Sequence, residues 1–437
     1  MPFPDSPFDD FFNTRILFQL KDSSECLIDD NAANETLKWL CTSPKLTTFR
    51  INTLKTSKDV VQQLIQDQLD KIMGFNIAKA EFSILVDNVI EIKHVPSDLS
   101  SSIQESKEII VDVECAAAVL RGAHIYAPGI LGMQSGTQLN DQVKVYADVS
   151  GKCKKGWSKL YLNKEKEFIG NGVVQMTRNM LFGENICPNG IAVEMKNVIS
   201  NCPPMGNEFL PSGYAMLQNL PSIICVESLD PQKGETIVDL CAAPGNKTAH
   251  IAALTENNCK LIAFDKTPKK IALLNDTCLK YEIKALVLQQ DSTKIIQNLS
   301  SFTNILTLGQ VDRVLLDAPC SALGKRPQFR NKTTEKVIQS YVPLQRKLFE
   351  TAVLLLKSEG TLVYSTCTIS LAENEGIVAW ALRTWDCLEL MKPRNSFGGP
   401  GWVGTSLSET YRNKVQRFGP KQIVDSAGFF IACFRKK

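Results

Sequence analysis

The sequence has few histidines, no closely paired cysteines and no long apolar run, and each absence excludes a class of protein. There are three histidines among 437 residues, and none of the fourteen cysteines forms a Cys-x-x-Cys pair, so we expect no metal site. No apolar run reaches the length of a membrane span, so we expect no membrane partner. Residues 1–5 do not begin a signal peptide, and free thiols then predict a reducing, cytoplasmic location.

The charge is nearly balanced, with 49 basic and 46 acidic residues, so the formal charge of +3 does not by itself indicate nucleic-acid binding. The length exceeds that of one ordinary core and predicts two or three domains. Changes of pattern divide the chain into a helical and α+β part at residues 1–105, a second region at 106–199 and a third at 200–437. We expect the polar residues 98–105 to be a linker.

Residues 106–199 alternate short apolar runs with glycine-containing turns, which is typical of a small β-barrel. The loop at residues 151–159 carries Lys154, Lys155 and Trp157. Lysine ammonium groups attract the phosphates of an RNA backbone, and an exposed indole can stack on a base, so this loop is a candidate RNA contact. A solvated hairpin tip is the alternative interpretation, since basic loops of this kind are common.

From residue 235 strands and helices alternate, which predicts an α/β fold with a doubly wound, mostly parallel sheet. The connector before this region has helical periodicity over residues 214–227, and residues 82–86 of the N-terminal part have the pattern of a strand. The expected strands of the sheet are residues 236–240, 260–264, 285–289, 312–316, 361–364 and 428–434, and the expected helices are residues 248–254, 268–280, 336–357 and 371–385.

Two cysteines follow strands that we expect to be neighbours. Asp317-Ala318-Pro319-Cys320 closes one strand, and Ser365-Thr366-Cys367-Thr368 closes the next. Residues 336–357 between them are long enough to be the crossover helix of two parallel strands. Ligands bind at the carboxyl ends of such strands, so the two thiols and the Asp317 carboxylate would face one crevice and could attack a pyrimidine ring. Buried structural cysteines are the alternative interpretation.

A turn rich in small residues follows the first strand and opens a helix, which places free backbone N–H groups against a ligand. It lacks the glycine spacing of dinucleotide folds, which disfavours a nicotinamide dehydrogenase. Asp239, Asp265 and Asp291 end three neighbouring strands and together favour a cationic cofactor, although each alone is better explained as a helix cap. The turn comprises Cys241, Ala242, Ala243, Pro244, Gly245, Asn246 and Lys247.

At these residues the sequence resembles the Sun-domain RNA cytosine-5 methyltransferases, and the resemblance covers essentially the whole chain. Its strongest parts are residues 239–247, 315–324 and 363–368. Residues 106–199 resemble a PUA domain, an RNA-binding barrel, inserted before the catalytic sheet. That insertion marks the branch of the family that methylates cytosine 72 in the acceptor stem of certain tRNAs, beside the CCA end. The resemblance implies a Rossmann-like methyltransferase sheet, S-adenosylmethionine as cofactor and tRNA as partner. Messenger RNA is a further candidate partner, and we expect a monomer.

Residue roles follow from this resemblance. The turn at residues 241–247 would bind the cofactor, with Asp265 on the ribose and Asp291 at the adenine end. Asp317 would face both the transferred methyl group and the target base. Cys367 matches the nucleophile of the family, and Cys320 matches the thiol that assists release. The remaining implied contacts are Lys270 at the cofactor carboxylate, and Arg121, Tyr126, Lys154 and Lys155 at the tRNA.

Two residues depart from the pattern of the family. Asn246 stands where the cofactor loop commonly has a second glycine, and since Asn tolerates left-handed backbone better than most residues, the turn can survive. Its side chain could still crowd the cofactor. Ala322 replaces a glycine that usually follows Cys320-Ser321, which we expect to be the smaller concern for the backbone. Neither change removes a group that the chemistry needs.

Covalent catalysis explains the use of two cysteines. Carbon 5 of cytosine is a poor nucleophile, and a thiolate added to carbon 6 converts the ring to an enamine that can attack a sulfonium methyl group. The adduct is favoured if Asp317 gives a hydrogen bond or proton to ring nitrogen 3. Carbon 5 must then lose its proton and the bond to Cys367 must break, and Cys320 would assist this release.

Two other classes of protein remain open. A non-catalytic RNA-binding protein could retain the fold, although the presence of Cys320, Cys367, Asp317 and Lys247 argues against it. A DNA cytosine methyltransferase would use the cysteine of the Pro-Cys motif as its nucleophile, and Thr366-Cys367 would then have no explanation.

Overall fold

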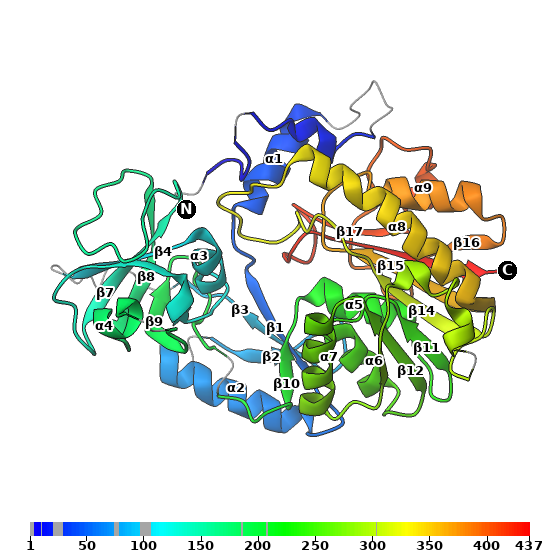
Figure 1. Ribbon diagram of the computed structural model, residues 1–437, viewed down its shortest axis with the longest axis horizontal. Coiled ribbons are helices and arrows are strands. Elements are labelled where there is room, and N and C mark those ends of the chain that lie inside the picture. Colours follow the sequence, from blue (N-terminus) through cyan, green and yellow to red (C-terminus); the bar gives the residue numbers. More distant parts are fainter. Residues whose placement is uncertain are drawn as a thin grey trace.

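The computed structural model describes residues 4–9, 11–20, 29–73, 78–96, 106–184, 187–206, 209–302 and 304–437, so the predicted linker at residues 98–105 lies outside the described part. Three sheets organise the chain (Figure 1). The largest belongs to the C-terminal half, a four-stranded sheet joins N-terminal strands to a later one, and a six-stranded sheet stands apart. Within these ranges we find no helix that is both long and apolar enough to cross a membrane.

The large sheet has the strand order β13-β12-β11-β14-β15-β18-β16, with β17 paired to β18. The first five strands are parallel, whereas β18 runs antiparallel to β15 and β16. The predicted doubly wound, mostly parallel sheet is therefore confirmed. The strands are β11 (Thr236–Asp239), β12 (Lys260–Asp265), β13 (Leu286–Gln289), β14 (Val311–Asp317), β15 (Leu356–Thr366), β16 (Leu388–Met391), β17 (Gln416–Phe418) and β18 (Phe429–Lys436).

Helices cover both faces of this sheet because successive strand residues point to opposite sides. Val238 and Leu362 belong to the core beneath α8 and α9, whereas Ile237 and Val363 belong to the core beneath α5 and α6. Helix α9 begins at Glu375 and not at the predicted residue 371. The helices around the sheet are α5 (Leu220–Leu229), α6 (Asn246–Leu254), α7 (Pro268–Tyr281), α8 (Glu335–Leu355) and α9 (Glu375–Thr384).

The four-stranded sheet has the order β10-β1-β3-β2, so a strand from beyond residue 200 completes an N-terminal sheet. The helix predicted over residues 214–227 is wrong at its start, because residues 215–217 pair with β1 and α5 begins only at Leu220. The strand predicted over residues 82–86 ends at Phe82, where Ser83 Oγ accepts the backbone N–H groups of the following turn. The elements are β1 (Leu46–Ile51), α2 (Lys58–Met73), β2 (Ala80–Phe82), β3 (Val89–Lys93) and β10 (Ala215–Leu217).

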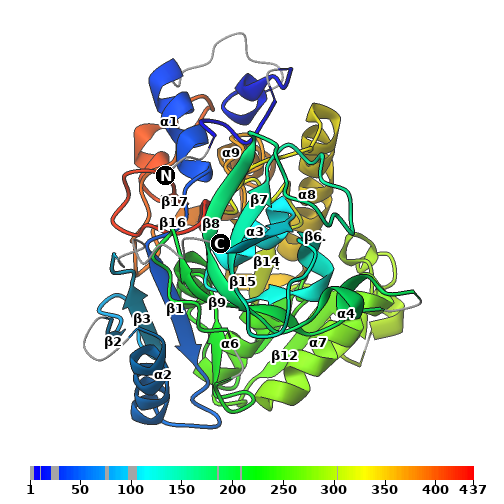
Figure 2. The ribbon, with the colours of Figure 1, turned by 90° about the vertical axis from the view of Figure 1, so that its left-hand side faces the viewer.

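The six-stranded sheet has the order β5-β9-β8-β7-β4-β6 and is antiparallel except between β4 and β7. In Figure 2, where this sheet faces the viewer, it lies in front of the large sheet, with α1 (Asp30–Leu40) above and α2 below. It has its own apolar core, to which Phe329, from the chain between β14 and α8, is added. Its elements are β4 (Lys107–Val111), α3 (Val113–Val119), β5 (Ile125–Tyr126), β6 (Ile130–Met133), β7 (Gln142–Asp148), β8 (Lys166–Val174), α4 (Arg178–Phe182) and β9 (Ile191–Val198).

Candidate active site at the carboxyl edge of the large sheet

The structure brings the two predicted cysteines together. Strands β14 and β15 are parallel neighbours, and Asp317 at the end of one pairs with Ser365 near the end of the other. The chain beyond each strand therefore leaves the sheet at the same edge. Cys320 and Cys367 lie there with their Sγ atoms 3.4 Å apart, within hydrogen-bond distance for sulfur. The pair is only partly exposed.

The pKa values of the two thiols are shifted in opposite directions. The hydrogen bond from Cys320 lowers the pKa of Cys367 despite its burial, and Lys247 and Lys325 add a favourable positive potential. The same hydrogen bond, together with burial, raises the pKa of Cys320 well above its usual value. Cys367 is therefore the sulfur that ionises first. A thiolate is the nucleophilic form of cysteine, so this polarity agrees with the role predicted for Cys367.

Asp317 lies beside the thiols and is held by two side chains. Lys247 Nζ donates a hydrogen bond of 2.6 Å to Asp317 Oδ2, and Ser365 Oγ donates one of 2.7 Å to Asp317 Oδ1. Burial disfavours the Lys247 ammonium, but the Asp317 carboxylate more than compensates and raises the pKa of Lys247. The carboxylate therefore has a fixed orientation at the sheet edge, and one predicted cofactor residue is its partner.

The cofactor turn has its left-handed residue at Gly245, with φ of 106°, and not at Asn246. Asn246 is instead the first residue of α6, so the concern about left-handed backbone at this position is removed. A Cβ at Gly245 would lie 2.9 Å from Leu274 Cδ1, which is a second reason for glycine there. Arg50, fully buried on β1, donates to the Asn246 carbonyl at 3.3 Å and thus ties the N-terminal sheet to this turn.

Backbone strain at Ala322 is greater than the sequence suggests. Its φ is 55°, which is in the left-handed region that glycine adopts without penalty. For a residue with a Cβ this conformation costs about 1–2 kcal/mol. The glycine that the family carries here thus has a conformational reason, and alanine retains the turn at some cost.

The acids at the other strand ends have nearby hydrogen-bond donors and lysines as partners. Asp265 is buried and accepts hydrogen bonds from the backbone N–H groups of Ala243 and Lys266, at 3.0 and 2.7 Å. Lys270 Nζ lies 3.2 Å from Asp265 Oδ1, so the ammonium expected at the cofactor carboxylate is paired here with this acid. Asp291 forms an ion pair of 2.9 Å with Lys266.

Asp239 contributes to the site from within the core. It is almost completely buried at the end of β11 and accepts hydrogen bonds from Thr248 Oγ1 and the backbone of Cys241, at 2.8 and 3.4 Å. Burial raises the pKa of Asp239 to about 7, with a further contribution from the charge of Asp317. Its hydrogen bonds link the last residue of β11 to the first turn of α6, and so they shape the cofactor turn between them.

Sequence reasoning missed a buried polar network behind the thiols. Glu373 is fully buried and accepts hydrogen bonds from the backbone N–H of Ser321 at 3.0 Å and from Gln345 Nε2 at 2.9 Å. Gln345 also donates to the carbonyl of Pro319 at 3.0 Å. Burial raises the pKa of Glu373. The network holds the loop of Cys320 against α8. The sequence signal was weak, since Glu373 lies in a polar run that reads as a helix start.

The predicted RNA contacts occupy two different settings. Lys154 and Lys155 are exposed, and within the described ranges neither ammonium group forms an ion pair. Trp157 is 37% exposed and packs edge-on against Tyr161. The half-exposed Tyr126 lies at the end of β5. Arg121 instead donates to the Arg326 carbonyl at 3.0 Å, at the junction with the catalytic part.

Comparison with known proteins agrees with this geometry. Residues 226–435 match the family model described as 16S rRNA methyltransferase RsmB/F. The mouse tRNA (cytosine(72)-C(5))-methyltransferase NSUN6 is 40% identical over 425 residues, which cover 90% of this chain and 87% of that protein. A tRNA (cytosine(72)-C(5))-methyltransferase from Pyrococcus horikoshii is 29% identical over 420 residues, covering 96% of each. The crystal structure of NSun6 from Pyrococcus horikoshii with SFG, an S-adenosylmethionine analogue, has a TM-score of 0.74 at 28% identity and covers 99% of both chains.

A large sheet of this strand order, with a small-residue turn after its first strand, defines the protein as an S-adenosylmethionine-dependent methyltransferase. The chain belongs to the Sun family of RNA cytosine-5 methyltransferases. The described part of the chain contains no group of three or more His, Cys, Asp or Glu side chains that could hold a metal ion.

The residues at the sheet edge fit this cofactor. The turn presents Ala242, Ala243 and Gly245, whose small size lets a ligand approach the backbone. The start of α6 adds free N–H groups. Asp265 at the end of β12 can accept ribose hydroxyls, and Asp291 at the end of β13 can accept from an adenine edge.

Proposed function

We propose that the protein methylates carbon 5 of cytosine 72 in the acceptor stem of tRNA, beside the CCA end. The observation that carries this is the thiol pair, with Sγ atoms 3.4 Å apart beside Asp317, in a chain that is 40% identical to mouse NSUN6. The relatives from mouse and from Pyrococcus horikoshii, which align with this chain over most of their length, are tRNA (cytosine(72)-C(5))-methyltransferases. Messenger RNA with a similar stem is a second candidate substrate.

In this mechanism Cys367 is the nucleophile. Its thiolate adds to carbon 6 of the target cytosine, which makes carbon 5 electron-rich. As the thiolate adds, ring nitrogen 3 takes up a proton from solvent, and its N–H then donates a hydrogen bond to the Asp317 carboxylate, which Lys247 and Ser365 hold in place. Bound S-adenosylmethionine supplies an electrophilic methyl group on a sulfonium. Carbon 5 then loses its proton to a water molecule, ring nitrogen 3 returns its proton to solvent, and Cys367 leaves as a thiolate. Cys320 assists this release by donating a hydrogen bond to the departing sulfur from 3.4 Å away.

The high pKa of Cys320 supports this division of labour. A thiol that keeps its proton at neutral pH does not compete for the electrophilic carbon 6. The same thiol can return a hydrogen bond to the departing Cys367 sulfur, because the two atoms are already within hydrogen-bond distance. The geometry therefore gives each sulfur one task.

We assign RNA binding to residues 106–199, as an inserted PUA domain between the N-terminal part at 1–105 and the catalytic part at 200–437. Its exposed Lys154 and Lys155 would contact phosphates, and Tyr126 and Arg121 would lie nearer the catalytic part. The target base is paired or stacked in the acceptor stem and must leave it to reach the thiols. We expect a cytoplasmic monomer.

Methyl transfer to defined RNA tests this proposal. Purified protein, S-adenosylmethionine and an acceptor-stem minihelix ending in CCA should give 5-methylcytosine at position 72 alone, read by bisulfite sequencing. A minihelix with uridine at position 72 is the matched control. RNA binding without any methylation, under conditions that saturate the cofactor, would instead favour a non-catalytic RNA-binding protein.

A further inference from the structure

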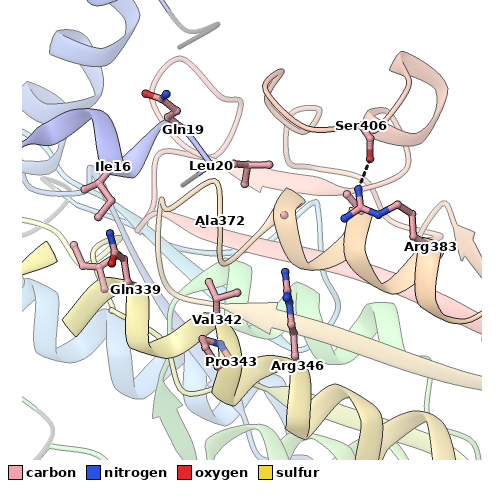
Figure 3. Close-up of a pocket in the computed structure, with 13 residues that line it drawn as sticks. Ile16, Gln19, Leu20, Gln339, Val342, Pro343, Arg346, Ala372, Arg383 and Ser406 are labelled. Atoms are coloured by element: carbon pink, nitrogen blue, oxygen red, sulfur yellow. Dashed lines mark hydrogen bonds between the residues drawn. The ribbon is translucent and has the colours of Figure 1, made fainter. Parts of the chain in front are cut away.

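A cavity of about 450 Å³ opens between the chain that follows η1 (Thr14–Leu17), α8 and α9 (Figure 3). This volume is within the ~300–1,000 Å³ typical of ligand pockets. Its walls are largely apolar and include Leu20, Val342 and Pro343. Arg346 of α8 and Arg383 of α9 bring guanidinium groups to the same cavity.

The described residues give the cavity a positive charge. Among the described residues that line it there is no Asp or Glu. Arg383 Nη1 donates to Ser406 Oγ at 3.0 Å, and the Arg346 guanidinium carbon lies 5.3 Å from the centroid of the Trp380 ring. Within the described ranges neither arginine forms an ion pair, so each has N–H donors to spare. Planar guanidinium groups of this kind match the geometry of phosphate.

The cavity adjoins the catalytic loops. Gln345 of α8 donates to the carbonyl of Pro319, directly before the first thiol, at 3.0 Å. The next residue on the helix, Arg346, lines the cavity. On the other wall, Ala372 directly precedes Glu373, whose carboxylate accepts from Gln345 at 2.9 Å. Adjacent faces of one helix thus serve the thiol loop and the cavity.

We propose that this cavity is a binding subsite for a nucleotide next to the target in the substrate RNA. Its phosphate would lie against Arg346 and Arg383, and its sugar or base against the apolar wall of Val342 and Pro343. This rests on the proposed function, in which an RNA strand must pass the thiol pair. An RNA strand supplies both an anion and a flat apolar surface for each nucleotide, which is the combination that the cavity presents.

Neutral substitutions test the charge contacts. Arg346→Gln and Arg383→Gln should each raise the RNA dissociation constant and KM about tenfold, as expected for a charge-assisted contact, with kcat unchanged. The slope of log affinity against log salt should fall by about one unit in the double variant, because both guanidinium groups contact one phosphate. The probe is the acceptor-stem minihelix, measured by fluorescence anisotropy and by methyl incorporation. Affinity for S-adenosylmethionine should be unchanged, which also verifies folding.

Two control variants separate the subsite from general charge. Lys347→Gln removes an exposed charge from the next position of α8, which is outside the cavity. Ser406→Ala removes the partner of Arg383 but leaves both guanidinium groups in place. Both should keep the salt slope of the unmodified protein. If the double arginine variant has the same salt slope and KM as Lys347→Gln, the proposal is overturned. An acidic protein segment would then be the better candidate for the occupant of the cavity.

A modified RNA locates the contact. A methylphosphonate at each linkage flanking cytosine 72 removes one phosphate charge at a time. Modification of one of these linkages should weaken RNA binding as much as the double arginine variant does. When this modified RNA is combined with the double arginine variant, the loss of affinity should be no larger than with either change alone. Additive losses at every linkage would also overturn the proposal. If the unmodified protein binds but does not methylate the minihelix, the proposed function fails, and the binding measurements still decide the subsite.

Discussion

Cys320 and Cys367 lie with their Sγ atoms 3.4 Å apart, although 47 residues separate them in the sequence. Parallel pairing of β14 with β15 creates this relationship, because it brings both strand ends to one edge. A small displacement of either loop would break the contact between the sulfurs. The buried Glu373 network opposes such displacement, since it fastens the loop of Cys320 to α8.

Removal of each thiol should stop the reaction at a different step. Cys367→Ala should reduce methyl transfer by roughly 10⁴-fold or more, because the nucleophile is lost, while S-adenosylmethionine still binds. Cys320→Ala should instead accumulate a covalent protein–RNA adduct that survives a denaturing gel. The exposed Cys187→Ala is the matched control and should behave as the unmodified protein does. An adduct in Cys367→Ala and not in Cys320→Ala would reverse the assignment and indicate the chemistry of a DNA cytosine methyltransferase.

Asp239 should make stability depend on pH. Burial raises its pKa to about 7 in the folded protein, whereas the unfolded chain loses this proton near the usual value of 3.8. Between these values the folded state holds the extra proton, so the free energy of unfolding falls as pH rises and levels off above pH 7. Asp239→Asn removes the titrating carboxyl and with it this pH dependence of the free energy of unfolding. The Tm of the variant relative to the unmodified protein should therefore increase from pH 4 to pH 7, as measured by calorimetry without cofactor.

An exposed acid supplies the control for this titration. Asp276→Asn on α7 changes the same chemical group at an exposed position, so it controls for the loss of one carboxyl group from the chain. Parallel curves for Asp239→Asn and Asp276→Asn would show that Asp239 does not retain its proton in the folded protein.

Ala322→Gly should stabilise the protein by up to about 1 kcal/mol, because relief of left-handed strain exceeds the entropy that glycine adds to the unfolded chain. Denaturant unfolding with matched m-values measures this change. Ala272→Gly in the middle of α7 should have the opposite sign, at about 1 kcal/mol destabilising. A destabilised Ala322→Gly variant would mean that the backbone at this residue is not strained.

Charge reversal at the basic loop should weaken RNA binding in a salt-dependent way. Lys154→Glu with Lys155→Glu should lower minihelix affinity most at low salt and reduce the salt slope by about two units. Lys284→Glu with Lys294→Glu carries the same change in charge on the catalytic part. If both double variants lose affinity equally, the loop has no specific role and acts only through net charge.

The catalytic half was well predicted because its signals are local. Apolar runs that end in acids or cysteines mark β11, β12, β14 and β15, and the lengths between them require crossover helices. Residues 215–217 were predicted to be helical, yet they form β10 because β1 offers them a partner far away in the sequence. No pattern within a short window contains that information.

The finer features of the site depended on contacts that a sequence does not display. The left-handed residues of the two turns are Gly245 and Ala322, which only the backbone path reveals. Lys266 and Lys270 pair with acids of the cofactor edge because α7 starts directly after β12. Arg50 reaches the cofactor turn from another sheet. Residue types were thus predictable at the site, whereas their partners were not.

Strand β1 acquires its second neighbour late in synthesis. Thr48 and Gln218 are bonded across 170 residues, so one side of β1 is open until β10 leaves the ribosome. At ~5–20 residues per second this interval is roughly 10–30 s. The six-stranded sheet is translated completely within it and can fold first. In a nascent chain stalled shortly after residue 200, the edge of β1 that faces β10 would therefore have unpaired backbone N–H and C=O groups, and chaperones would be expected to bind such an exposed edge strand.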